Sequence, residues 1–296
     1  LYSSVAMLAL THGQAATPTT FGKEMAVFHR RLNRQAAMLK EQRLQGKISG
    51  ATGTWAAHIV AYPGIDWIRF SGRLVKRFGL NPSPVTTQVE PHDSLAESYH
   101  ILARINSILI DFTRDMWLYI SRAILGQKKI AGETGSSTMP HKINPIYFEN
   151  AEGNCGLANA ILNHLANKLT ISRMQRDLSG STVVRNQGVA LGYSFIGLNN
   201  LMKGINRITI NRENMSAELD KHWEVLAEAI QTILRKNGYP DAYNKMKNFT
   251  RGSHIDRETI HNLITDLKIN IDDKNSLLKL TPADYTGLAT KLARRK

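Results

Sequence analysis

Apolar residues return at helical spacing along much of the chain. Over residues 20–43 and 92–124 they recur every three or four positions, which places them on one face of a long helix in each stretch. The apolar positions are Met25, Phe28, Leu32, Ala36 and Leu39 in the first stretch, and Leu95, Tyr99, Leu102, Ile105, Leu109, Phe112, Met116 and Ile120 in the second. The second stretch has no interior proline or glycine. Helices of this length bury their apolar faces in bundles, often against partner subunits.

The remaining pattern is also helical. Further helices are predicted at 147–169, 187–207 and 212–236, and shorter ones at 241–249, 256–267 and 282–294. Strand signals are few; residues 84–89 are extended but brief. The sequence therefore predicts an all-α fold. We expect a long-helix bundle domain over residues 1–210, incomplete at its N-terminus, and a small helical C-terminal domain over residues 211–296.

Composition narrows the class of protein. Hydrophobic residues make up 42% and charged residues 21% of the 296, which is ordinary for a globular protein. No apolar run is long enough to cross a bilayer, and the apolar start lacks the basic segment of a signal peptide. Cys155 is the only cysteine, so an internal disulfide is impossible and a cytoplasmic location is expected. Its apolar helical setting predicts a core residue and not a nucleophile.

The net charge of +14 is compatible with three kinds of partner: nucleic acid, an anionic surface or an anionic small substrate. The basic residues are spread along the whole chain, with one short cluster at residues 291–296. Neither a zinc-finger spacing nor an aromatic-rich RNA-binding motif is present in the sequence. We therefore expect a solvated basic surface and do not expect nucleic acid as a partner.

Two polar stretches interrupt the helices, at residues 11–20 and 132–145. The second contains Gly132 and Gly135, which permit unusual backbone shapes, followed by hydroxyl side chains and Lys142. Backbone N–H groups and an ammonium group could together hold a carboxylate, although a plain surface loop would have the same composition. Polar segments between rigid helices are where chemistry tends to lie.

Residues 135–145 read GSSTMPHKINP. This segment resembles the signature of the fumarase/aspartase superfamily, G-S-S-x-M-P-x-K-x-N-P, at every fixed position. Four further segments resemble the adenylosuccinate lyase branch in its bacterial form, in the same order along the chain. They are residues 11–24, with Thr-His-Gly-Gln at their start; residues 86–93, which read TTQVEPHD; residues 140–142, which read PHK; and residues 173–186, which begin RMQRDL.

The resemblance implies a carbon–nitrogen lyase of purine and AMP biosynthesis. Such an enzyme releases fumarate by β-elimination from adenylosuccinate, giving AMP, and from the succinylated carboxamide nucleotide SAICAR, giving AICAR. It implies Ser136 as the base that removes a proton beside a carboxylate, and His12 as the acid that protonates the departing nitrogen. A serine works as a base only if its alkoxide is stabilised, a task that suits N–H groups and Lys142. Histidine suits the acid role because its ordinary pKa is near neutral.

The substrate carries carboxylates and a phosphate, which arginine's planar fork fits well. By the resemblance, the substrate-binding residues are Thr11, Gln88, Ser137, Lys142, Ile143, Asn144, Asn150, Arg176, Ser181 and Arg185. No cofactor and no metal are expected, since His92, His141 and His164 lack a compact ligand spacing. The branch forms homotetramers whose active sites draw on three chains, so His12 and Ser136 of one site are expected to come from different subunits.

The chain departs from the branch at several positions. Leu10 and Ala15 flank the first motif, where arginine and proline are common, and Gly180 replaces a usual aspartate. The branch also has a further N-terminal domain with a histidine–aspartate pair and a Thr-Ser segment, and these 296 residues lack those motifs. We therefore expect the sequence to begin partway through a longer chain. Two alternatives remain open: another superfamily lyase such as argininosuccinate lyase, or a non-catalytic helical scaffold.

Overall fold

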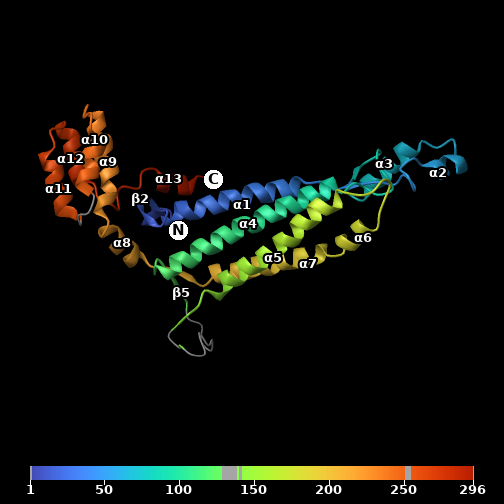
Figure 1. Ribbon diagram of the computed structural model, residues 1–296, viewed down its shortest axis with the longest axis horizontal. Helices are drawn as coiled ribbons and strands as arrows, with labels where there is room; N and C mark the ends of the chain where they lie inside the picture. Colours follow the sequence, from blue (N-terminus) through green and yellow to red (C-terminus); the bar gives the residue numbers. More distant parts are fainter. Residues whose placement is uncertain (1, 129–138, 140–141, 251–254, 296) are drawn as a thin grey trace. The chain divides into compact units, whose positions relative to one another are not determined.

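The computed structural model describes residues 2–128, 139, 142–250 and 255–295 (Figure 1). The described chain is mostly helical, which confirms the predicted fold class. It divides into two compact units: residues 1–29, 121–126 and 209–296 form one, and residues 30–120 and 127–208 form the other. The division follows packing and not chain order, and the expected domains at 1–210 and 211–296 stay a prediction.

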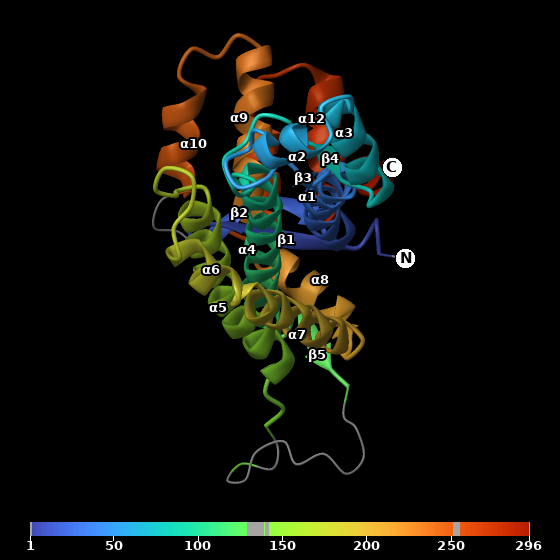
Figure 2. The same cartoon turned by 90° about the vertical axis from the view of Figure 1, so that its right-hand side faces the viewer.

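The second unit is built on the predicted long helices. They are α1, Phe21–Glu41, most of which belongs to this unit, α4, Asp93–Ser121, α5, Ile146–Leu169, and α7, Gln187–Ile205. Figures 1 and 2 show α4, α5 and α7 packed together along their lengths. Their shared core is rich in alanine and leucine; its buried members are Ala96, Tyr99, Ala103, Ala158, Leu162, Leu165, Ala166, Leu169 and Ala190.

Helices α5 and α7 approach each other closely because small residues lie at their crossing. A Cβ atom added at Gly197 would lie 2.6 Å from Sγ of Cys155, and one at Gly204 would lie 3.0 Å from the ring of Phe148. Cys155 is fully buried, and this burial raises the pKa of its thiol to about 11. The prediction of a core cysteine is confirmed.

The chain between α1 and α4 contains elements that the periodicity did not predict. Strand β3, Gln45–Gly46, pairs in parallel with β4, Asn81–Pro82, and between them lie α2, Ala56–Ala61, and α3, Trp67–Arg77. These helices are short and rich in bulky residues that stay partly exposed, so neither has the sustained apolar face of α4. Residues 84–89 form bends and no strand, contrary to the brief extended segment expected there.

The first unit begins with an antiparallel hairpin of β1, Ala6–Thr11, and β2, Gln14–Thr20. Its helices are α8, Arg212–Asp220, a 3-10 turn at Trp223–Leu226, α9, Ala227–Lys236, α10, Ala242–Thr250, α11, Arg257–Asp266, α12, Ile271–Lys279, and α13, Ala289–Arg294. Their core includes Trp223, Leu226, Ile230, Ile260 and Leu277. The short strands β5, Leu125–Gln127, and β6, Ile208–Ile210, pair with each other.

Two predicted helices of this unit were wrong in their bounds. The helix expected over 212–236 is broken after Asp220, where Lys221 and His222 turn the chain before the 3-10 turn. The helix expected over 282–294 begins only at Ala289, and α12 precedes it. The Asn270 side chain caps α12 by accepting a hydrogen bond from the Asp272 N–H at 2.7 Å. Such a cap marks the start of a helix that is too short to show a long apolar stripe. Within the described residues, no helix combines the length and apolarity needed to cross a membrane.

Candidate active site

His12 occupies the tip of the β1–β2 hairpin. His12 and Gly13 both have positive φ, 53° and 74°, as a two-residue turn requires when it follows the twist of the strands. Thr11 and Gln14 pair across the turn, and Thr11 and His12 are exposed. The Thr-His-Gly-Gln motif is therefore a hairpin turn, and the turn holds a histidine side chain out from the end of two strands.

The hairpin is tied to helix α9 through a carboxylate. The Thr17 hydroxyl of β2 donates to Glu228 at 2.5 Å, and the Tyr285 hydroxyl donates to the same carboxylate oxygen at 2.9 Å. Burial, followed by this hydrogen bond to Glu228, raises the pKa of Tyr285 to about 12, so the phenol stays protonated and keeps donating. On the other strand, β1, Leu8 packs against Leu219 of α8 and Val225 of the 3-10 turn. These contacts fix the strands that carry His12.

Asp177 organises the turn that carries Arg176 and Ser181 in the second unit. Its carboxylate accepts from the Ser179 hydroxyl at 2.5 Å, from the Ser179 N–H at 2.9 Å and from the Arg173 guanidinium at 2.9 Å. The Ser179 hydroxyl is the largest of the contacts that lower the pKa of Asp177 to about 2. Helix α6, Ser179–Val184, begins at this turn, with Ser181 in its first turn and Arg185 directly after it.

Gln88 lies against the same turn. Its backbone N–H donates to the Gln175 carbonyl at 3.2 Å. Lys47 holds the segment from the other side, because its ammonium donates to the carbonyls of Thr87 at 3.0 Å and Gln88 at 2.7 Å. Desolvation lowers the pKa of Lys47 from its ordinary value. The structure thus brings Gln88 beside the Arg176 segment, although 88 positions separate the two in sequence.

A cavity of about 100 Å³ lies between these two segments. Arg176 and Ser181 line it together with His92 and Gly180, while Arg185 is exposed and is absent from its lining. A Cβ atom at Gly180 would meet nothing within 4 Å, so close packing does not require glycine at this position. His92 is the residue that sequence reasoning missed as a part of this site. Its place in the TTQVEPHD segment was the available signal.

Lys142, Ile143 and Asn144 lie at the other end of α5. Gln127 donates to the Ile143 carbonyl at 2.9 Å, and Lys142 is exposed. The Asn150 side chain donates to the Ile146 carbonyl of its own helix at 3.1 Å and is likewise exposed. Ser136 and Ser137 lie outside the described residues.

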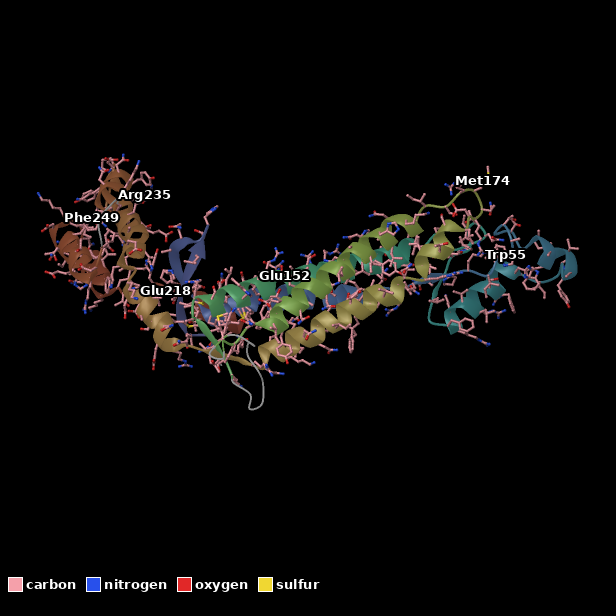
Figure 3. All side chains as sticks on the ribbon, turned by 60° about the horizontal axis from the view of Figure 1, so that its bottom comes forward. Trp55, Glu152, Met174, Glu218, Arg235 and Phe249 are labelled. Atoms are coloured by element: carbon pink, nitrogen blue, oxygen red, sulfur yellow. The ribbon has the colours of Figure 1, made fainter. Side chains whose placement is uncertain are left out.

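Helix α5 separates the two groups of predicted residues. It has 24 residues and is therefore about 36 Å long. Lys142 precedes its first turn, and Arg176 follows its last. In Figure 3 the labels mark Glu152, in the second turn of α5, and Met174, just beyond the end of this helix. Within one chain, the second unit does not bring its predicted substrate-binding residues to one place.

Replacing Asp177 with alanine is expected to loosen the turn that carries Arg176 and Ser181. The turn loses the acceptor of its hydrogen bonds, so amide hydrogen exchange over residues 173–181 should accelerate about tenfold or more. The same loosening is expected on acidification. Because the folded-state pKa is about 2 and below the ordinary value, the contribution of Asp177 is present above about pH 4 and is lost as pH falls toward 2.

Exchange measured by mass spectrometry on the intact protein tests this, with Asp266→Ala as the control at an exposed aspartate on α11. Unchanged exchange over 173–181 in Asp177→Ala would show that the turn does not depend on this carboxylate.

The sequence of this chain matches the models of two protein families. Residues 1–159, more than half of the chain, match the family described as Lyase. The chain belongs to this lyase family. Residues 172–286 match the family described as Adenylosuccinate lyase C-terminal, which covers the Arg176 turn and most of the C-terminal helices. The resemblance stated from the motifs is thereby confirmed.

Several similar relatives share almost the whole of this lyase-family chain. It is 52% identical over 293 residues to the adenylosuccinate lyase of Legionella pneumophila (strain Corby), covering 99% of this chain and 64% of that protein. It is 50% identical over 288 residues to the adenylosuccinate lyase of Escherichia coli (strain K12), covering 97% of this chain and 63% of that protein. The chain therefore spans just under two thirds of the length of these relatives.

Solved structures with low sequence identity share the fold. The 3-carboxy-cis,cis-muconate lactonizing enzyme from Pseudomonas putida superposes with a TM-score of 0.76 at 22% identity, covering 99% of this chain and 66% of that chain. The fumarate lyase from Mesorhizobium sp. BNC1 superposes with a TM-score of 0.73 at 19% identity, with the same coverage. The predicted superfamily fold is confirmed.

Proposed function

We propose that this chain is the larger part of an adenylosuccinate lyase. The reaction is the β-elimination of fumarate from adenylosuccinate, giving AMP, and from SAICAR, giving AICAR, in purine biosynthesis. The observation that carries the proposal is the 52% identity to a protein of that name across 99% of this chain. The complete superfamily signature at residues 135–145 supports the same reaction class.

Two proton transfers define the proposed mechanism. Ser136 removes a proton from the carbon beside a substrate carboxylate; the carbon–nitrogen bond then breaks, and His12 gives a proton to the departing nitrogen. The electron pair of the broken C–H bond becomes the double bond of fumarate. Lys142 offers positive charge where the carboxylate becomes more negative. The exposed position of His12 on a rigid hairpin fits a group that must meet a substrate.

Substrate binding is assigned to the remaining predicted residues. Arg176 and Ser181, which line one cavity, and Gln88 beside them suit the phosphate or a carboxylate of the nucleotide. Arg185 follows directly after α6. Thr11, Ser137, Ile143, Asn144 and Asn150 complete the proposed contacts. Proton transfer between side chains and substrate needs neither a metal nor a cofactor, so none is proposed.

The proposed enzyme is a homotetramer with shared active sites. Support comes from the length of α5, which keeps Lys142 apart from Arg176 in one chain, and from the surface of α7. Helix α7 buries mainly small residues and leaves a stripe of large apolar side chains exposed. The stripe is Leu191, Phe195, Leu198 and Met202. A second copy of the chain packed on this stripe would bury it and bring a second set of site residues near.

A cytoplasmic location is proposed with this function, in keeping with the free thiol of Cys155. Argininosuccinate lyase is the nearest alternative enzyme. The match of residues 172–286 to the C-terminal family of adenylosuccinate lyase favours the purine substrate.

Fumarate release tests the proposal. The intact gene product is incubated with adenylosuccinate and, separately, with argininosuccinate, beside a Ser136→Ala variant. We expect fumarate from adenylosuccinate alone and a loss of at least about a hundredfold in the variant, the usual scale for a missing general base. Fumarate from argininosuccinate alone would favour the alternative lyase. No fumarate from a folded, intact protein would favour a non-catalytic scaffold.

A further inference from the structure

His92 lies beside the predicted substrate-binding residues and has no role in the mechanism so far. It lines the cavity of about 100 Å³ that Arg176 and Ser181 also line. Its side chain is 32% exposed, so a ligand in the cavity could reach the ring. Asp177 also lines the cavity, but its carboxylate is occupied by Ser179 and Arg173. Glu90 does not line the cavity, and its carboxylate lies 3.6 Å from Nδ1 of the His92 ring.

The backbone of His92 is in a conformation that few residues with a side chain adopt. Its φ is 68°, in the left-handed region, directly before the first residue of α4. Residues that precede a helix usually have extended backbone, and a residue with a side chain is strained in the left-handed region. Strain of this kind concentrates at binding sites, where the surroundings hold a side chain in a required direction.

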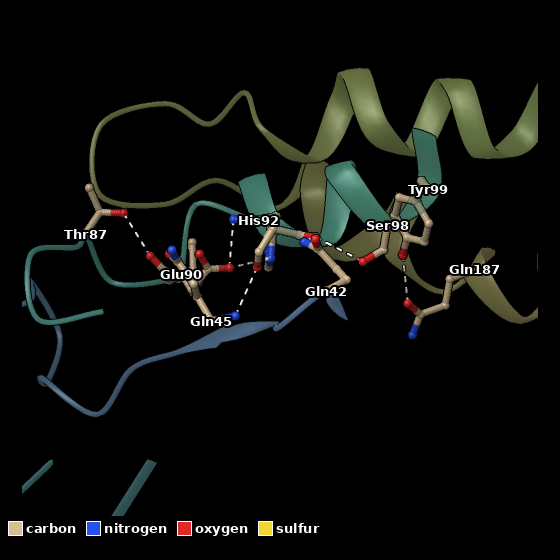
Figure 4. Close-up of polar contacts among 10 residues, drawn as sticks. Gln42, Gln45, Thr87, Glu90, His92, Ser98, Tyr99 and Gln187 are labelled. Carbon is tan, nitrogen blue, oxygen red and sulfur yellow. Dashed lines mark hydrogen bonds and ion pairs between the residues drawn. The ribbon is translucent and has the colours of Figure 1, made fainter. Parts of the chain in front are cut away.

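Glu90 contacts both the backbone and the ring of His92. Its carboxylate accepts the backbone N–H of His92 at 2.8 Å and lies 3.6 Å from Nδ1 of the ring (Figure 4). The Glu90 side chain is only 12% exposed, and its other oxygen, Oε1, is buried with no hydrogen-bond partner among the described residues. A buried carboxylate is an expensive feature unless a cation faces it. Nδ1 of His92 is the ring nitrogen that faces this carboxylate.

We propose that His92 binds the anionic group of the substrate that Arg176 and Ser181 hold, with Glu90 as the positioning residue. In the imidazolium form both ring nitrogens donate. Nδ1 faces Glu90, so Nε2 is the nitrogen that donates to an anion in the cavity. This inference rests on the proposed function for the identity of the substrate. The contact itself requires only an anion of the size of a phosphate or carboxylate.

Binding measurements on the intact protein test the proposal, with AMP and fumarate as probes and calorimetry as the readout. Asparagine adopts the left-handed conformation more easily than other residues with a side chain, so His92→Asn keeps the backbone and removes the ring. We expect the Kd of AMP or of fumarate to rise about tenfold, the value of one charge-assisted hydrogen bond. The KM for adenylosuccinate should rise similarly while kcat stays within about threefold.

Controls separate binding from structure. His100→Asn makes the same change at an exposed position of α4 and should alter neither constant. His92→Arg supplies another cationic donor and should restore part of the affinity. Glu90→Gln should weaken binding less than His92→Asn, since it leaves the ring in place. If His92→Asn failed to fold, His92→Gly would make the same comparison, because glycine takes positive φ without strain.

The results for the His92 variants distinguish a contact with the phosphate from a contact with a carboxylate. A weaker AMP affinity with unchanged fumarate affinity assigns the contact to the phosphate, and the reverse assigns it to a carboxylate; either supports the proposal. Unchanged affinity for both in a folded His92→Asn or His92→Gly variant overturns it. If the wild-type protein binds AMP but releases no fumarate, the proposed function fails while the binding comparison at His92 still decides this inference.

Discussion

Two impaired variants, Lys142→Ala and Arg176→Ala, are expected to regain activity when their subunits are mixed. Each variant alone should lose about a hundredfold or more in kcat/KM, because each removes a cation that the proposed mechanism places against substrate charge. The two residues lie beyond opposite ends of α5, a helix of 24 residues that is about 36 Å long. A site that uses both must take them from different chains. Random mixing then leaves about a quarter of the sites with both residues intact.

The measurement is fumarate release after the two intact variants are unfolded together and refolded, compared with each variant refolded alone. The matched control mixes Arg176→Ala with Ser181→Ala. These two residues line one cavity of one chain, so every chain in that mixture carries a damaged cavity and no rescue is expected. Equal recovery in both mixtures, or none in either, would contradict the shared site.

Phe195→Glu is expected to break the assembly. Phe195 is 65% exposed at the centre of the α7 stripe, and a large apolar side chain left in water on a rigid helix is typical of an interface. Burying an unpaired carboxylate there would cost several kcal/mol per subunit contact, enough to dissociate most oligomers. Activity should fall with the assembly, since each site would lose residues from its neighbours.

Light scattering coupled to gel filtration measures the mass of the intact variant, and circular dichroism checks that its helices persist. Lys203→Glu is the control, since it places a carboxylate on α7 at an exposed position that already carries a charge. A Phe195→Glu protein with unchanged mass and activity would show that α7 does not form the interface.

Helical periodicity was enough to predict α1, α4, α5 and α7. In each, apolar residues repeat at helical spacing over several turns, and this repeat marks a helix even where part of the apolar surface stays exposed, as on α7. The same method missed α2, α3 and α12, although it found α10 and α11, and it joined α8 to α9 across Lys221 and His222. A short helix depends on its caps and on its neighbours, and a turn of two residues leaves little trace in the pattern.

The candidate residues were likewise within reach of the sequence, because the motifs around His12, Gln88, Lys142 and Arg176 are local. The sequence did not show which of these residues lie close together in the folded chain. Gln88 and Arg176 meet because a hydrogen bond joins Gln88 to Gln175 across 87 positions of chain, whereas Lys142 and Arg176, closer in sequence, are separated by a whole helix.

The sequence by itself determined the family, the long helices and the residue types available for chemistry. Only the tertiary structure decided that these residues form separate groups in one chain, that α7 exposes its apolar stripe, and that His92 takes a left-handed backbone beside a buried carboxylate. The physical reason is how far apart in sequence the interacting residues lie. Periodicity and motifs record interactions within a few turns of chain, while the position of a group in space depends on the packing of segments far apart in sequence.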